Sequence, residues 1–112
     1  MKKLEIIIKP ERLDDLKSIL DNCKSTGIML TNIMGYGTQK GFTQIYRGHE
    51  HTVNILPKLK VETVVSDEIA NTIIDAVVEK IKTGAYGDGK IFVYDVTDAV
   101  RIRTGEHGEN AL

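Results

Sequence analysis

Glycine and lysine are concentrated in the stretch KTGAYGDGKIFV, residues 82–93. Gly84, Gly87 and Gly89 permit backbone conformations that expose N–H groups and allow close approach of a ligand, and Lys82 and Lys90 add positive charge. This combination is suited to binding phosphates. Its spacing matches neither the Walker nor the Rossmann pattern, so a glycine-rich turn that simply leads into a strand remains the alternative.

Charged residues within and after this stretch bear on the same hypothesis of a phosphate site. Arg101 and Arg103 stand two apart, and in an extended segment they would point to the same side, where two guanidinium groups favour a bound anion. A solvated surface pair is the alternative. Asp88 either orients a lysine or a ligand hydroxyl, or caps the turn.

The stretch YRGHEH, residues 46–51, contains His49, Glu50 and His51 in a row. Such a triplet raises the question of a metal site or a catalytic base. Adjacent residues of an extended segment point in alternating directions, and two histidines are fewer than the three protein ligands of a catalytic zinc. A metal hydrolase is therefore disfavoured.

Composition indicates one ordinary globular domain. The chain has 112 residues, 41% hydrophobic and 28% charged, and its 15 basic and 16 acidic side chains give a net charge of −1. This balance argues against a nucleic-acid-binding or membrane-surface protein. Cys23 is the only cysteine, so we expect a buried thiol in a reducing compartment. The first residues, interrupted at Pro10, are too short for a signal peptide or membrane span, and we expect a cytoplasmic protein.

Hydrophobic periodicity predicts the order βαββαβ. A helix opens near Pro10 and ends at Gly27, and Ser66 and Asp67 cap a second helix. This is the ferredoxin-like α+β arrangement, with two helices on one face of a four-stranded antiparallel sheet. The expected strands are residues 4–8, 28–34, 58–65 and 91–96.

Two features of this predicted fold call for partners. The strand at 58–65 alternates between unlike faces, and the sheet face without helices needs a cover, so we expect a closed homo-oligomer. Irregular connections longer than roughly 12–15 residues are uncommon, and the link at residues 37–57 exceeds that length, which favours a function such as partner binding. An exposed loop with no role is the alternative.

The sequence resembles a known protein family over nearly its whole length. TGAYGDGKIFVYDV at 83–96 and VRIRTGEHGENAL at 100–112 are similar to the carboxyl-terminal signatures of the PII nitrogen-regulatory signal-transduction proteins, of the GlnB and GlnK type. GYGTQKGFTQIYRG at 35–48 and LPKLKVETVV at 56–65 resemble the start of that family's long loop and the strand after it.

The resemblance implies a non-enzymatic homotrimer that senses nitrogen and energy status. ATP and ADP would compete for clefts between subunits, with Arg101 and Arg103 reaching in from the neighbouring subunit. With MgATP bound, 2-oxoglutarate would bind beside the phosphates. The implied nucleotide residues are Gly35, Gly37, Thr38, Gln39, Glu62, Val64, Gly87, Asp88, Gly89, Lys90, Arg101 and Arg103. The implied 2-oxoglutarate residues are Gln39, Lys40, Gly41 and Lys58, and Gln39 would also help to bind magnesium.

Several positions depart from the family pattern. Thr38 stands where many members have an arginine that reaches the phosphates, and Met29 where many have a threonine near the base. His51 replaces the tyrosine that many members uridylylate, and His49 replaces a serine that others phosphorylate. Regulation by ligand occupancy alone is therefore expected.

Three function classes follow from these residues. The favoured one is a regulator whose segment 37–57 docks onto a partner through Tyr46, Arg47, His49, Glu50 and His51. An ammonium transporter is the expected partner; glutamine synthetase, nitrogenase or a transcription factor are others. The second class is a slow ATPase or loop metal enzyme. A nucleic-acid-binding ferredoxin-like domain is the third, and it lacks both a basic charge and an aromatic stacking platform.

Overall fold

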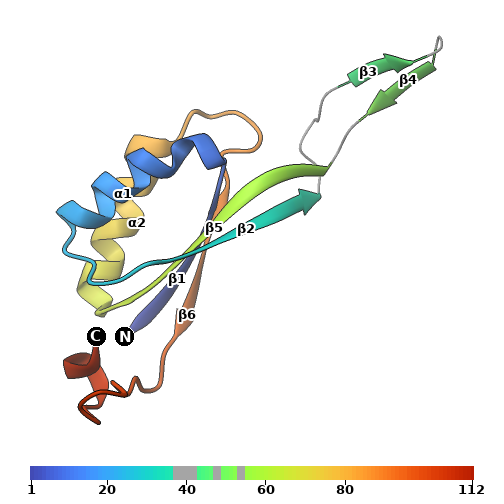
Figure 1. Ribbon diagram of the computed structural model, residues 1–112. Helices are drawn as coiled ribbons and strands as arrows, with labels where there is room; N and C mark the ends of the chain where they lie inside the picture. The colour runs from blue at the N-terminus through green and yellow to red at the C-terminus, as the bar shows by residue number, and fades with distance from the viewer. Residues whose placement is uncertain (37–42, 47–48, 53–54) are drawn as a thin grey trace.

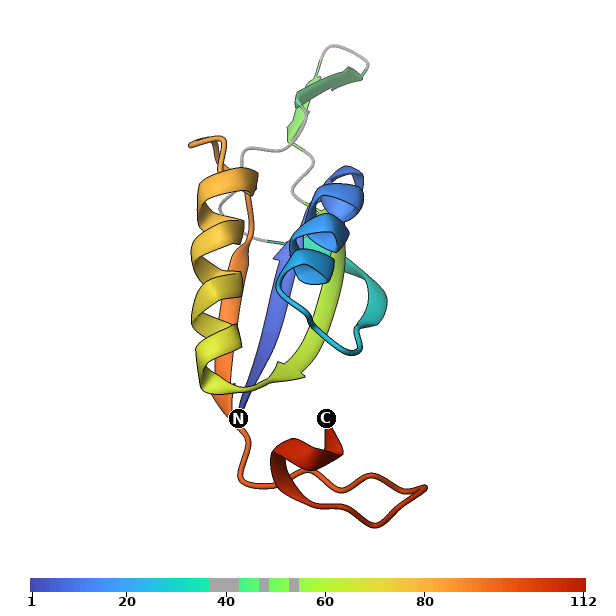
Figure 2. The ribbon, with the colours of Figure 1, turned by 90° about the vertical axis from the view of Figure 1, so that its left-hand side faces the viewer.

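A four-stranded antiparallel sheet carries two helices on one face, as Figure 1 and Figure 2 show. The computed structural model describes the backbone of residues 1–36, 43–46, 49–52 and 55–112, and the side chains of 1–36 and 55–112. The sheet order is β2-β5-β1-β6, which confirms the ferredoxin-like prediction. The elements are β1 (Lys2–Ile8), η1 (Pro10–Arg12), α1 (Leu13–Asn22), β2 (Met29–Tyr36), β3 (Thr43–Tyr46), β4 (His49–Thr52), β5 (Ile55–Val65), α2 (Asp67–Ile81), β6 (Lys90–Asp95) and η2 (Gly108–Ala111).

The core lies between the sheet and the two helices. Alternate residues of β5 are buried there, as the period-two pattern predicts. Leu4, Ile6 and Ile8 of the neighbouring β1 are at most 2% exposed. α2 contributes its predicted apolar stripe, so residues spaced by three and four positions meet the same sheet face. The buried residues of these three elements are Leu4, Ile6, Ile8, Leu59, Val61, Thr63, Val65, Ala70, Ile73, Val77 and Ile81.

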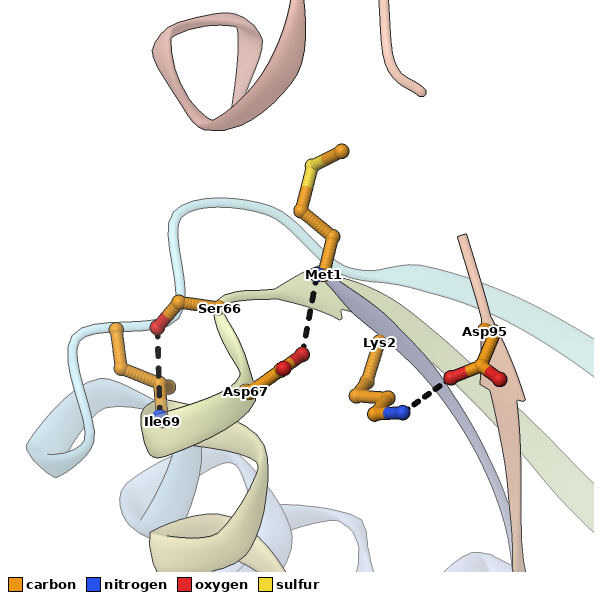
Figure 3. Close-up of polar contacts among 6 residues, drawn as sticks. All are labelled: Met1, Lys2, Ser66, Asp67, Ile69 and Asp95. Carbon is orange, nitrogen blue, oxygen red and sulfur yellow. Dashed lines mark hydrogen bonds and ion pairs between the residues drawn. The ribbon is translucent and has the colours of Figure 1, made fainter. Parts of the chain in front are cut away.

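Three elements meet at the amino end of α2 (Figure 3). The Ser66 hydroxyl accepts a hydrogen bond from the Ile69 N–H, so Ser66 is the helix cap that the sequence predicts. The Met1 ammonium lies 3.0 Å from the Asp67 carboxylate, and the Lys2 ammonium pairs with Asp95 at the end of β6. Asp67 in the first turn also complements the positive end of the helix dipole.

The first helix is shorter than predicted. α1 ends at Asn22 and not at Gly27, because Lys24 takes a left-handed conformation with φ of 60°. The Ser25 N–H bonds the Leu20 carbonyl at 3.0 Å, which is a Schellman ending formed without glycine. Cys23 therefore caps the helix and is half-buried against the core, whereas we expected a fully buried thiol inside the helix.

The link at residues 37–57 contains regular structure that periodicity did not predict. β3 and β4 pair antiparallel, with Tyr46 opposite His49, and β5 begins at Ile55, before the predicted end of the link at Pro57. In Figure 1 this hairpin lies beyond the end of the four-stranded sheet. Both of its strands belong to no other sheet among the described residues.

The sheet face without helices carries a charged network. The Lys3 ammonium lies 2.8 Å from Glu62, Lys60 lies 3.8 Å from Glu5 and 3.7 Å from Glu62, and the Tyr94 hydroxyl donates to Glu5. The large, mainly apolar side chains that are exposed on the same face are Met29, Phe92 and Tyr94. Within one chain this face is uncovered, as the alternating pattern of β5 predicted.

The cap of α2 can be tested by Ser66→Ala. Removing the side-chain acceptor leaves the Ile69 N–H without its partner, so the free energy of unfolding should fall by about 1 kcal/mol. Urea unfolding at fixed protein concentration measures the change. Ser18→Ala, at an exposed position in α1, is the matched control and should change stability by less than about 0.5 kcal/mol. Equal effects of the two substitutions would exclude a capping role.

Candidate functional site

The glycine-rich segment forms the loop between α2 and β6. Gly84, Gly87 and Gly89 have φ values of 83°, 92° and 110°, a region that side chains with a Cβ rarely enter. The Asp88 carboxylate closes the loop by accepting from the Thr83 N–H at 2.8 Å, the Gly84 N–H at 2.9 Å and the Thr83 hydroxyl. Of its two predicted roles, Asp88 has that of a turn cap.

The same hydrogen bonds explain the acidity of Asp88. Donation from the Thr83 hydroxyl is the largest influence lowering the pKa of this carboxyl group, followed by the Thr83 N–H, while partial burial opposes it. Because the ionised form accepts all three bonds, the loop geometry is fully stabilised above the ordinary aspartate pKa. This stabilisation is lost as pH falls through the lowered pKa of Asp88.

Gly89 lies directly against the carboxyl end of β1, an inner strand of the sheet. A Cβ at this position would overlap the carbonyl oxygen of Ile7 in β1. The loop can approach the sheet this closely only with glycine here, and Lys90 then starts β6 beside β1. The contact fixes one end of the loop to the sheet.

Lys58, near the start of β5, connects that strand to the loop. Its side chain is 8% exposed, and its ammonium donates to the Gly87 carbonyl at 3.2 Å. Burial is the main cause that lowers the pKa of Lys58, and the nearby Lys9 charge lowers it further. Gly35 of β2 leaves room for the lysine stem, since a Cβ there would lie 3.0 Å from Lys58 Cγ.

These residues form one group, here termed the glycine-loop cluster. Its members are Gly35, Lys58, Gly87, Asp88, Gly89 and Lys90.

A second group lies around the carboxyl-terminal segment. Val64 and Arg101 line a cavity of about 620 Å³ together with Met29 and Leu112, and these four residues are termed the carboxyl-terminal cluster. The Arg101 guanidinium donates to the Leu112 main-chain oxygen at 2.8 Å and lies 3.6 Å from the Glu106 carboxylate.

The two arginines do not lie in the extended segment that we predicted. The Gly105 N–H bonds the Arg101 carbonyl at 2.7 Å, so residues 101–105 form a tight turn. The argument that Arg101 and Arg103 share one side because they are two apart is therefore wrong. Arg101 is half-buried, whereas Arg103 is exposed.

Glu62 is held as an anion on the open face of the sheet. The hydrogen bond from the Lys3 ammonium is the largest cause that lowers the pKa of Glu62, and the Lys60 charge contributes to the same shift. Its carboxylate is 16% exposed. An ionised carboxylate is an acceptor only, which suits it to an amine donor.

Sequence reasoning missed the pair that closes the carboxyl-terminal segment. The Asp98 carboxylate accepts from the Gly108 N–H at 3.1 Å and lies 2.7 Å from His107 Nδ1. The His107 interaction lowers the pKa of Asp98 more than any other contact does. Residues nine positions apart in an irregular segment leave no periodic signal. The only sequence feature that indicates this pairing is Gly105, a residue that favours a turn between them.

The two clusters lie at opposite ends of the sheet. Lys58 and Val64 are six residues apart on β5, which corresponds to about 20 Å along a strand. Lys90 begins β6, and Arg101 follows the other end of that strand. The resemblance implies that Val64 and Lys58 line one side of a cleft and that Arg101 comes from the neighbouring subunit. Within one chain, Val64 lies beside Arg101 and far from Lys58.

Some predicted site residues fall outside this description. Tyr46, His49, Glu50 and His51 are placed by their backbone in β3 and β4 only. Those outside the described residues are Gly37, Thr38, Gln39, Lys40, Gly41 and Arg47.

Two kinds of feature are missing from the described residues. No group of three or more histidine, cysteine, aspartate or glutamate side chains there has a geometry that could hold a metal ion. No described helix is long and apolar enough to cross a membrane.

Comparison with known proteins gives concordant results. The family model for nitrogen regulatory protein P-II matches residues 1–106. The chain is 52% identical to the nitrogen regulatory protein P-II of Pasteurella multocida and 48% identical to nitrogen regulatory protein P-II 1 of Escherichia coli K12, over 112 residues and the full length of each. The structure of Bacillus subtilis GlnK superposes with a TM-score of 0.80 at 38% identity, covering 99% of this chain and 97% of that one.

The sheet order, the two helices and the glycine loop thus define a ferredoxin-like regulatory protein of the GlnK fold. The chain belongs to the nitrogen regulatory protein P-II family, whose members are signal-transduction proteins. The predicted resemblance is confirmed. The relatives are named as regulatory proteins and not as enzymes.

The contact between Gly89 and Ile7 predicts a large difference between two glycine substitutions. Gly84→Ala should cost about 1–2 kcal/mol for its left-handed backbone alone, because nothing lies near its added methyl group. Gly89→Ala bears the same cost and also collides with the Ile7 carbonyl, so its loss of unfolding free energy should be at least twice as large. Guanidinium unfolding of both variants measures this. Equal losses would show that the loop can move away from β1.

The role of Asp88 predicts faster amide exchange in Asp88→Asn. The amide cannot offer two charged acceptor oxygens, so the Thr83 and Gly84 N–H groups should lose protection from hydrogen exchange, while the Ile69 N–H in the α2 cap should not. In the wild type the same loss should occur on acidification through the lowered pKa of Asp88 and be absent at neutral pH. Unchanged protection in the variant would contradict the capping role.

Proposed function

We propose that this chain is a sensor of nitrogen and energy status that binds ATP or ADP between the subunits of a homotrimer. With MgATP bound it also binds 2-oxoglutarate, and segment 37–57 regulates a partner protein. The proposal is supported by family membership and by one observation in particular, the separation of the two clusters.

The separation favours a ligand site shared by two chains. A ligand touching both clusters of one chain would have to extend about 20 Å along the sheet. Two copies placed side by side instead bring the glycine-loop cluster of one to the carboxyl-terminal cluster of the other. The uncovered sheet face, with its charged network and exposed Phe92, is available for such packing.

Two features of the glycine-loop cluster fit an anionic ligand. Lys58 is a nearly buried cation, and no described carboxylate lies within ion-pair distance of it, so a ligand carboxylate would offset its desolvation. The exposed Lys90 beside glycines with positive φ offers charge and backbone N–H donors for phosphates. Lys58 is thus assigned to 2-oxoglutarate and Lys90 to the phosphates.

The carboxyl-terminal cluster fits the opposite end of a nucleotide. Met29 and Val64 provide apolar walls for a base, and Glu62, which is paired with Met29 on the same face of the sheet, can accept from an adenine amine. Arg101 contributes a guanidinium, which donates to the Leu112 main-chain oxygen. A phosphate would offer this guanidinium a charged acceptor.

The hairpin β3–β4 is the proposed site of partner docking. It extends beyond the main sheet, and it begins eight residues after Gly35, which lies next to Lys58. Ligands at Lys58 can therefore favour one arrangement of this segment over another, which is the requirement for a ligand-controlled switch. The proposed partner is an ammonium transporter, and Gln39 is assigned to magnesium.

Titration calorimetry tests the ligand assignments. ATP and ADP should each bind, and 2-oxoglutarate should bind only with MgATP present. Lys90→Ala and Arg101→Ala should each weaken ATP at least about tenfold by removing a charged donor. Lys17→Ala, at an exposed position on α1, is the control and should leave ATP affinity unchanged. ATP binding unaffected by either site substitution would refute the proposal.

Mixed oligomers test whether two chains share the site. Lys90→Ala and Arg101→Ala chains, refolded together, should recover ATP binding in some clefts, since each chain supplies the residue that the other lacks. A site within one chain predicts no recovery on mixing. The wild type mixed with Lys90→Ala shows how much binding the intact chains alone provide.

A further inference from the structure

A cavity lies on the helix side of the glycine loop, on the opposite face of the sheet from Lys58. Its volume is about 350 Å³, and it is bounded by the last two turns of α2, the end of β1 and the start of β6. Val77 and Ile81, which line it, belong to the covered face of the sheet, whereas Lys58 lies on the open face. The glycine loop thus lies between the apolar, helix-covered side of the sheet and the open face that carries Lys58.

The walls of this cavity are aliphatic. Ile74, Val77, Val78 and Ile81 form one side along α2, and Ile8 and Ile91 form the other. None of the described side chains that line it is aromatic, so they offer no stacking surface for a flat ring. The α2 wall from Ile74 to Ile81 is about 10 Å long, at 1.5 Å per residue.

The charge around the cavity is positive. Lys82 and Lys90 line it, and neither forms an ion pair with any side chain that the structure describes. The one acidic lining residue is Asp88, whose oxygens are engaged by Thr83 and Gly84. An apolar cavity with two lysines around it suits a ligand with one anionic end and one alkyl end.

We propose that this cavity binds a straight-chain carboxylate of roughly six to ten carbons, a length that fits the wall of α2. The alkyl chain lies along Val77 and Ile81, and the carboxylate meets Lys82. Because the cavity shares the glycine loop with the proposed nucleotide site, its occupant would be a second effector. The cavity itself does not depend on that proposed site.

A chain-length series tests the proposal by calorimetry on the full-length protein, below micelle-forming concentrations. Affinity should rise about fourfold per added methylene from butyrate to octanoate, the gain expected for burying one CH₂, and level off near decanoate. Octylammonium, with the opposite charge, should not bind. No rise with chain length, or equal binding of octylammonium, would overturn the proposal.

Substitutions locate the ligand. Val78→Trp, at a half-exposed position on α2, should fill the cavity and abolish octanoate binding, and Lys82→Gln should weaken octanoate several-fold. Lys17→Gln on α1 is the charge-matched control and should bind octanoate normally. Folding is checked by circular dichroism. Octanoate binding that survives in folded Val78→Trp would place the ligand elsewhere and refute the cavity assignment.

Discussion

The alternating burial of β5 is the constraint on which the rest of the molecule depends. Val61 and Thr63 face the helices and are almost completely buried, which fixes the register of the strand. The same alternation directs Lys58 and Glu62 to the open face. A slip of one residue would bury those charges in the core, so packing and ligand chemistry are set by one pairing register.

The close contact of Gly89 with β1 fixes the position of the glycine loop relative to that strand register. β1 pairs with both β5 and β6, so the loop that precedes β6 is positioned relative to Lys58 through a single strand. Asp88 then closes the loop from within. The loop is therefore held by the sheet on one side and by its own hydrogen bonds on the other.

The two clusters give the chain a polarity along the sheet. Lysines and glycines with positive φ lie at the glycine loop, and apolar walls with one guanidinium lie near Arg101. The proposed nucleotide site needs both sets of residues, so this division supports its proposed location between two copies.

Local patterns in the sequence determined the fold class, the α2 stripe, the Ser66 cap and the two faces of β5, because each depends on residues close together in the chain. The sequence motifs also identified the P-II family. Tertiary structure alone decided the early end of α1, the turn that contains Arg101, and the Asp98–His107 pair. It also decided that Val64 lies beside Arg101 and about 20 Å from Lys58, since proximity between distant segments comes from strand pairing and leaves no periodic signal in the sequence.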